Sequence, residues 1–217
     1  FFKHSNELDI TIIDYKTYFE YTPGILRCFI LPSFYQKLTC PLSVLLKTGT
    51  NVISGEVVSV QVEDPTNNGN KNEVTLKDGR RIPYDYLVLA NGSSYPGPIK
   101  PTPSQQTTAD RQRQWNYAAE ELDRAQTVAI VGAGAVGVEL AGEIRDKYSA
   151  GTKRVMLIDM APTILPGLEP ASIRYATKWL ENHDVELYLG SPLKKIDSNS
   201  VTFKEGTKVR VDIVYKC

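Results

Sequence analysis

The chain has 217 residues, and its 25 lysines and arginines balance 25 aspartates and glutamates to a formal net charge of zero. This balance leaves no strong field to attract nucleic acid or an anionic membrane surface, so no nucleic-acid partner is expected. The three cysteines lie far apart, which is typical of reduced thiols and predicts an intracellular protein. No run of about 18 apolar residues is present, so no membrane span is predicted, while other membrane contact stays open.

The first predicted strand covers residues 8–13 and leads directly into Asp14, which is followed by turn-forming polar residues. In nucleotide-binding α/β folds, a strand that ends in an acid is normally the second strand of its sheet. Only seven residues precede it, and they contain no glycine and no strand-like run. The first strand of such a sheet is therefore expected to lie outside this sequence.

Short β-branched alternations predict further strands. One runs from Val52 to Val62 and another from Glu73 to Leu76, on either side of the polar cluster PTNNGNKN, and together they predict an antiparallel hairpin. The run YDYLVLA, residues 84–90, predicts a strand that ends at Asn91-Gly92. The proline-rich residues 93–108 cannot form a regular element and are interpreted as a linker between domains.

The most specific motif is TVAIVGAGAVGVELAGEIRDKY, which follows a helix predicted over residues 109–125. A strand leads into Gly132, Gly134 and Gly137, and a helix opens at once. In a dinucleotide-binding loop the first glycine makes the tight turn, the second lets the backbone approach a pyrophosphate, and the third allows close packing of helix on strand. The helix N-terminus then faces the phosphates with its partial positive charge.

The next strand, RVMLID, ends at Asp159, 22 positions after Gly137. A carboxylate at this place can accept hydrogen bonds from both hydroxyls of an adenosine ribose. It would repel a 2′-phosphate by about a few kcal/mol at roughly 4 Å. No arginine follows in Met160, Ala161 or Pro162, so the sequence favours NADH over NADPH.

The remaining pattern completes this unit. A helix is predicted over residues 169–183, a strand over 185–190, and a hairpin with a terminal strand over 201–217. Helical spacing favours a packing role for Trp115 and Trp179. The predicted class is α/β, with a near-complete Rossmann-like NADH domain at residues 104–217.

Other reactive side chains give no site. His4 and His183 are distant in sequence and have no supporting acids, so neither a metal site nor an acid–base pair is predicted. Cys28 and Cys40 are too far apart for a redox pair and are interpreted as structural thiols.

The order of these parts resembles the two-dinucleotide flavoproteins of the pyridine nucleotide-disulfide oxidoreductase superfamily. The resemblance rests on the acid-terminated strand, the hairpin, YDYLVLANGS, the proline-rich crossing and VAIVGAGAVGVELAGEI. Within that superfamily, DYKTYFEYTPGILR is most similar to the apoptosis-inducing-factor-like and type II NADH:quinone oxidoreductase branch. This branch makes the mitochondrion one compartment to consider.

The resemblance implies further site residues. Asp14 would hold the ribose of FAD, Ala90 and Gly92 would lie on the FAD side, and Glu139 would lie near the nicotinamide and flavin. The family glutamate that Glu139 matches often pairs with a lysine, and Lys16 is one option for that lysine here. A solvated or helix-pairing role for Glu139 is also open.

Two short segments permit alternative interpretations. Thr22-Pro23-Gly24 matches a loop that approaches the flavin, although a simple turn explains Pro-Gly equally well. Asn91 stands where the family has threonine; it tolerates a left-handed turn but leaves one FAD contact in doubt.

The resemblance also implies the architecture and the reaction. Residues 1–103 would form a partial FAD-binding domain with a β-hairpin insertion, without the first glycine loop, next to the NADH domain at 104–217. The complete enzyme would use FAD and NAD, passing a hydride from NADH to the flavin and on to a quinone or similar acceptor. Three explanations stay open for the first domain: the sequence is part of a longer chain, another segment or a protein partner completes the domain, or the domain has a different arrangement.

Two other functions stay open at this level. The chain could be a non-catalytic subunit of a larger assembly that keeps the fold without flavin, because the first glycine loop is missing and Asn91 departs from the pattern. It could also bind NADH alone and act as a sensor. The electron acceptor and the oligomeric state are not specified by the residues present.

Overall fold

The computed structural model describes residues 8–46, 50–63, 72–95 and 97–217. The chain forms two compact units, each of which is described by itself. The first comprises the chain up to Glu20, Thr39–Ser94 and Pro101–Arg111. The second comprises Tyr21–Leu38, Tyr95–Lys100 and Gln112–Cys217. The predicted division into an FAD part and an NADH part at residue 103 concerns cofactor binding and stays a prediction.

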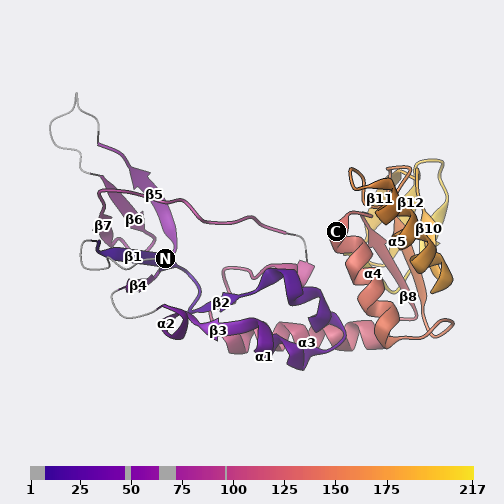
Figure 1. Cartoon of the computed structure of the whole chain (residues 1–217), viewed down its shortest axis with the longest axis horizontal. Coiled ribbons are helices and arrows are strands. Elements are labelled where there is room, and N and C mark those ends of the chain that lie inside the picture. The colour runs from indigo at the N-terminus through magenta and orange to yellow at the C-terminus, as the bar shows by residue number, and fades with distance from the viewer. Residues whose placement is uncertain (1–7, 47–49, 64–71, 96) are drawn as a thin grey trace. The chain divides into compact units, whose positions relative to one another are not determined.

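The second unit, in which Figure 1 labels β8 and β10, is built on a four-stranded parallel sheet in the order β10-β9-β8-β14. All its neighbours pair in parallel. Its strands are β8 (Thr127–Val131), β9 (Arg154–Ile158), β10 (Val185–Tyr188) and β14 (Ile213–Lys216). Strands buried on both faces need continuous apolar runs, and VAIV and VMLI supply them. The predicted parallel α/β sheet is confirmed.

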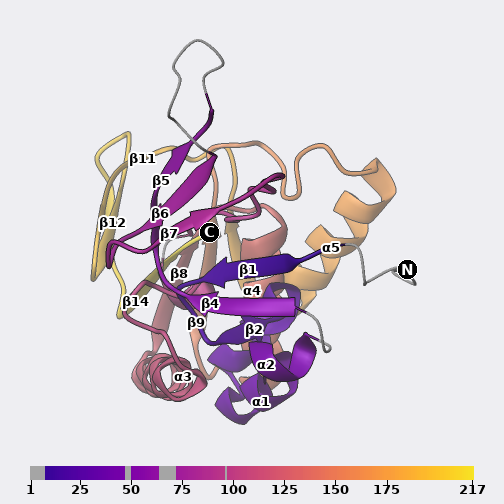
Figure 2. The same cartoon turned by 90° about the vertical axis from the view of Figure 1, so that its left-hand side faces the viewer.

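Each face of this sheet is covered by a different layer (Figure 2). Because side chains alternate along a strand, Val128 and Ile130 point to one face and Ala129 to the other. The first face packs on α3 (Thr108–Arg124), α4 (Ala135–Lys147) and α5 (Pro170–Asn182). The second packs on the antiparallel strands β11 (Leu193–Asp197), β12 (Ser200–Phe203) and β13 (Lys208–Arg210). The result is a three-layer arrangement, with helices on one face of the parallel sheet and antiparallel strands on the other.

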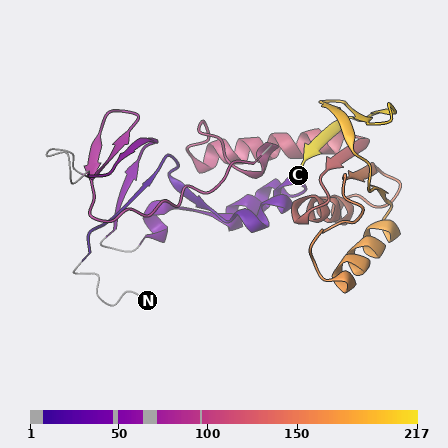
Figure 3. The ribbon, with the colours of Figure 1, turned by 90° about the horizontal axis from the view of Figure 1, so that it is seen from above.

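The helical layer has a core of large side chains. Trp115 on α3 is fully buried, as its packing role predicted. Phe29 meets Trp115 edge to face at 5.2 Å between ring centroids, and it meets Tyr215 in the same way at 4.9 Å. Phe29 belongs to a set of short helices that the sequence pattern did not predict, visible with α3 in Figure 3: η1 (Thr22–Phe29), η2 (Pro32–Phe34), α1 (Tyr35–Leu38) and η3 (Gly97–Ile99).

Gly142 lies in the interior of α4, and a Cβ atom added there would meet nothing within 4 Å. Glycine in a helix interior is less favourable than alanine by roughly 0.5–1 kcal/mol because it loses more backbone freedom on folding. We therefore expect Gly142→Ala to raise the free energy of unfolding by about 0.5–1 kcal/mol, measured by urea denaturation. An unchanged or lower midpoint would contradict an unobstructed helix at this position.

The described residues of the first unit form three small sheets. β1 (Ile10–Asp14) pairs in parallel with β4 (Thr50–Ser54), and β2 (Tyr18–Glu20) pairs with β3 (Thr39–Pro41), which precedes α2 (Leu42–Leu45). The third sheet joins β5 (Val57–Gln61), β6 (Glu73–Leu76) and β7 (Arg81–Pro83) in antiparallel order (Figure 2).

The predicted hairpin is therefore correct only in its second half. β5 and β6 pair as expected, but Val52 and Ile53 belong to β4, which pairs with β1. The break comes at Gly55, whose N–H donates to the carbonyl oxygen of Asp14 at 3.0 Å. Alternation alone could not show this change of partner. Most of the predicted turn, PTNNGNKN, lies outside the described residues.

The predicted strand at residues 84–90 is not formed. The chain from Tyr84 to Ser94 is drawn as coil after β7 in Figure 1. Its apolar side chains face solvent: Tyr86 is 92% exposed, Val88 84% and Leu89 72%. A strand is stable only when a neighbour pairs with its backbone, and none of the described strands does so here. The strand prediction is wrong for this chain for that reason.

A buried ion pair closes the first unit near the start of α3. The guanidinium of Arg111 donates to both carboxylate oxygens of Glu20, at 2.7 Å and 3.0 Å. The side chains are 0% and 2% exposed. The pair joins α3 to β2 through side chains that would be costly to bury singly.

Candidate functional site

The glycine loop between β8 and α4 needs glycine at two positions for backbone reasons. Gly132 has φ +112°, in the left-handed region, and a Cβ there would lie 2.1 Å from the carbonyl oxygen of Cys217. A Cβ at Gly137 would lie 1.9 Å from the carbonyl oxygen of Gly132. Only hydrogen fits at either place, so these two residues fix the turn and the close approach of helix to strand.

Gly134 differs, because a Cβ there would meet nothing within 4 Å. The residue is the N-cap of α4, in an extended conformation, and no side chain caps the helix. The first hydrogen bond of the helix runs from the N–H of Val138 to the carbonyl of Gly134 at 3.1 Å. The earlier N–H groups of such a helix point outward and have no partner inside it. The loop therefore presents open space and backbone donors at a positively polarised helix end.

Asp159 follows β9 and lies beside this loop. Its Oδ2 accepts a hydrogen bond from the N–H of Ala133 at 2.6 Å, and its Oδ1 accepts one from the N–H of Ala161 at 2.8 Å. Each carboxylate oxygen keeps a further lone pair, so the half-buried group can still accept from hydroxyl groups. The structure thus brings Asp159 together with the glycine loop and holds its carboxylate in one orientation.

A segment that the sequence pattern did not single out also supports the loop. Leu165 donates its N–H to the carbonyl of Ala133 at 2.7 Å and has φ +48°, which is unusual for a branched residue. Ile164 beside it is fully buried. The turn signal was the pair Pro166-Gly167, where Gly167 has φ +91°. Sequence reasoning could have found a turn here but not its contact with the loop.

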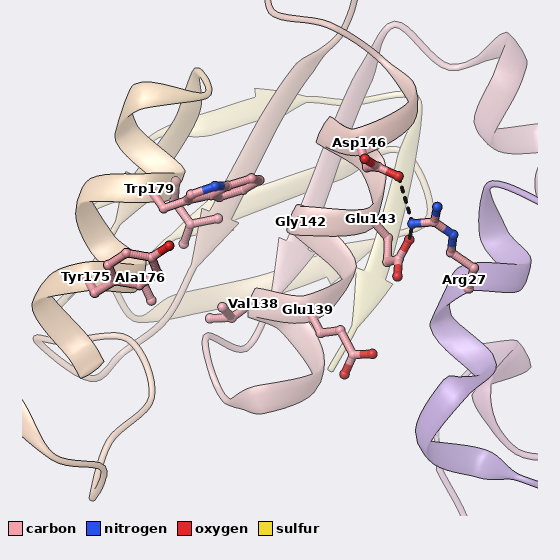
Figure 4. A pocket seen from close by; sticks show the side chains of 10 residues that line it. Arg27, Val138, Glu139, Gly142, Glu143, Asp146, Tyr175, Ala176 and Trp179 are labelled. Atoms are coloured by element: carbon pink, nitrogen blue, oxygen red, sulfur yellow. Dashed lines mark hydrogen bonds and ion pairs between the residues drawn. The ribbon is translucent and has the colours of Figure 1, made fainter. Parts of the chain in front are cut away.

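Glu139 lies on α4, and its side chain points away from the sheet (Figure 4). The residue is exposed, yet desolvation raises the pKa of its carboxyl, and the negative charge of Glu143 raises this pKa further. Arg27 from η1 makes ion pairs with Glu143 and Asp146, each at 2.7 Å (Figure 4). Lys16, the cation considered for Glu139, instead contacts Asp14.

The residues expected on the FAD side are only partly assembled. Asp14 ends β1 as predicted, and its two oxygens accept from the N–H of Lys16 at 2.9 Å and from its Nζ at 2.7 Å. Ala90 and Gly92 lie exposed in the segment that forms no strand. Gly92 has φ +67°, so the left-handed residue is this glycine and not Asn91. Among the described residues, no hydrogen bond joins Asp14 to Ala90 or Gly92.

Three other features concern metal binding, membrane crossing and the segment at Thr22. Within the described part of the chain, no group of three His, Cys, Asp or Glu residues could hold a metal ion. None of the helices in that part combines the length and apolarity that a membrane crossing requires. Thr22, Pro23 and Gly24 form the first turn of η1, where proline suits the helix start.

Known proteins share this arrangement. The family model described as pyridine nucleotide-disulphide oxidoreductase matches residues 5–217. Apoptosis-inducing factor homolog B of Dictyostelium discoideum is 24% identical over 96% of the chain and 57% of its own length. Ferroptosis suppressor protein 1 of Homo sapiens is 25% identical over 95% of the chain and 55% of its own length.

The fold is shared with solved structures as well. NDH2 from Plasmodium falciparum, solved in complex with NADH, superposes with a TM-score of 0.71 at 15% identity, covering 98% of this chain and 50% of that one. The chain spans about half the length of these proteins. The solved structures share the two-domain fold, and the family binds FAD and NAD(P)H. On its matched residues and its fold, the chain belongs to the pyridine nucleotide-disulphide oxidoreductase family.

Proposed function

We propose that the chain binds NADH across the loop from Gly132 to Gly137, and that the whole protein is an FAD-dependent NADH oxidoreductase. The observation that carries this proposal is the open, uncapped α4 N-terminus at Gly134 beside the fixed carboxylate of Asp159. A diphosphate placed there would accept from backbone N–H groups, and the ribose hydroxyls would donate to Asp159. NDH2 from Plasmodium falciparum, which has been solved with NADH, supports the same assignment.

Each residue has a separate proposed role. Gly132 and Gly137 shape the turn, and Gly134 leaves room for the pyrophosphate. Asp159 selects the ribose of NADH, and Glu139 lies near the nicotinamide end. Because the cofactors carry the redox chemistry, the protein supplies position and polarity rather than a proton donor.

The FAD side is proposed on fewer contacts. Asp14 ends β1 with a carboxylate that can accept from ribose hydroxyls, and Gly92 supplies a left-handed turn. These residues fit a nucleotide, although Ala90 and Gly92 are not positioned by a strand. When bound, FAD would take a hydride equivalent from NADH and pass electrons to a quinone or similar acceptor. An intracellular location, with the mitochondrion as one compartment, is proposed with this function.

Calorimetry with NADH tests the proposal directly. The chain is expected to bind NADH, and anaerobic addition of NADH to a flavin-loaded sample is expected to bleach the visible absorption of the flavin. A chain that folds, as judged by circular dichroism, but gives no heat with NADH would overturn the proposed site. If the protein binds NADH but takes up no flavin and stays colourless, the function as an NADH sensor would be favoured over the oxidoreductase.

The choice between the two nicotinamide cofactors provides a sharper prediction. Asp159→Ala is expected to weaken NADH binding roughly tenfold to a hundredfold, because hydrogen bonds to a charged group contribute about 1.5–3 kcal/mol. Met160 is 76% exposed, so an added Met160→Arg can be accommodated and would attract a 2′-phosphate. The double variant should prefer NADPH in calorimetric titration. An unchanged NADH affinity in Asp159→Ala would remove this residue from the site.

A second function, as a non-catalytic subunit completed by a partner, is motivated by unpaired backbone in the first unit. β1 pairs with β4 on one edge, and none of the described strands occupies its other edge. The exposed apolar side chains of Tyr86, Val88 and Leu89 lie in a strand-like sequence without a partner. Open edges and apolar patches are features of surfaces that accept another chain. A complex that never takes up flavin would support this function over the oxidoreductase.

A further inference from the structure

A hollow separates α4 from α5 in the second unit (Figure 4). Its volume is about 390 Å³, within the range of about 300–1,000 Å³ typical of small-molecule sites. It is lined by one face of α4, one face of α5 and a single side chain of η1, Arg27. The glycine loop and Asp159 do not line it, so the proposed NADH phosphate site does not account for it. Glu139, proposed to lie near the nicotinamide end, is the one residue that the hollow shares with the proposed NADH site.

The wall of the hollow on α5 is apolar and aromatic. Ala176 and Leu180 of α5 supply aliphatic surface, to which Val138 of α4 adds. Trp179 and Tyr175 supply ring faces (Figure 4). The Trp179 ring stacks on His183 with 3.8 Å between centroids and an interplanar angle of 16°. This contact restrains the indole. Trp179 is only half-buried, so the packing role predicted for it is incomplete.

The wall on α4 carries negative charge. Glu139, Glu143 and Asp146 follow one another at spacings of four and three residues, which places them on one face of the helix. Arg27 pairs with Glu143 and Asp146. Glu139 forms no ion pair with any other described residue. This wall therefore has three carboxylates, and one guanidinium pairs with two of them. The third carboxylate, Glu139, has no cation beside it in the described part of the chain, and desolvation raises its pKa.

We propose that this hollow binds a small organic cation, with its apolar body against Trp179 and Ala176 and its positive charge facing Glu139. A cation near Glu139 would supply the charge that Arg27 leaves unmatched. Tryptophan is the aromatic side chain that attracts cations most strongly, and the attraction rises as water is removed. An anionic ligand would be repelled by the same carboxylates. This inference goes beyond the proposed function, and it does not depend on NADH binding.

Choline is the first probe, because 3,3-dimethylbutan-1-ol has the same shape without the charge. Binding is followed by Trp179 fluorescence and by calorimetry; Trp115 is fully buried and provides a constant background. Choline is expected to bind about tenfold more tightly than the neutral alcohol, as a partly desolvated cation–π contact implies. Equal affinities, or no response to choline up to its solubility limit, would overturn the proposal.

Variants locate the charge and the ring. Glu139→Gln and Trp179→Ala are each expected to weaken choline binding about tenfold. Glu181→Gln makes the same chemical change on α5, outside the hollow, and should leave the affinity unchanged. Ala176→Leu should fill the hollow and block binding, which provides a second route if Trp179→Ala does not fold. Equal losses in Glu139→Gln and Glu181→Gln would show a general charge effect and contradict the site.

Discussion

Replacing Arg111 by methionine is expected to lower the free energy of unfolding by about 3–5 kcal/mol, measured by urea denaturation. The reason is that Arg111→Met leaves the carboxylate of Glu20 buried without its two hydrogen bonds. Breaking one side of a buried pair costs about this much because the remaining charge has lost its compensation. The effect is a large share of the stability of an ordinary domain.

Arg124→Met is the matched control on the same helix. Its ion pair with Glu120 joins side chains that are 73% and 61% exposed, and such pairs contribute about 0–1 kcal/mol. The double variant Glu20→Leu/Arg111→Met should recover much of the loss, since it removes both charges. If Arg111→Met and Arg124→Met cost the same, the Glu20–Arg111 pair does not stabilise the first unit in the way described.

Replacement by alanine is expected to lower stability at Gly137 and to weaken NADH binding at Gly134, although both glycines belong to one loop. Gly137→Ala should lower the free energy of unfolding by about 2–4 kcal/mol, because its Cβ would lie 1.9 Å from a backbone oxygen. Gly134→Ala should leave stability nearly unchanged, because its Cβ meets nothing in the protein. Gly134→Ala should nevertheless weaken NADH binding roughly tenfold to a hundredfold, because the added methyl group would occupy space proposed for the pyrophosphate.

Calorimetric titration of NADH and urea denaturation of both variants separate these effects. A stable Gly134→Ala variant that binds NADH as tightly as the parent would mean that no pyrophosphate lies against this residue. A Gly137→Ala variant of parental stability would mean that the helix can move away from β8, contrary to the close approach described here.

Local sequence pattern correctly predicted the strand, glycine turn and helix of residues 127–147. The alternation of VAIV, the three glycines and the following helix depend on contacts within about thirty residues, and they appear as β8, the turn and α4. Asp159 was expected at the end of the next strand, and it is there, bonded to the N–H of Ala133. Local physics determines such a unit because each glycine position is constrained by its own backbone.

Local sequence pattern gave wrong predictions where a strand depends on a partner that is distant in the chain. Residues 84–90 have the composition of a strand but form none among the described elements, since no neighbour pairs with them. Val52 and Ile53 continue an alternation into β5, yet they pair with β1. The pairing of Arg27 with α4 likewise joins residues more than a hundred positions apart, and no periodicity could have predicted it.

By itself, the sequence determined the α/β class, the glycine loop and the acid that follows it, because short-range sterics and strand or helix periodicity require those residues. Only the tertiary structure decided that Gly134 is open while Gly132 and Gly137 are closed by backbone, and that Glu139 borders a hollow without a cation of its own. The space around each glycine and the charges around Glu139 depend on which atoms of distant segments lie nearby. Tertiary packing determines those neighbours.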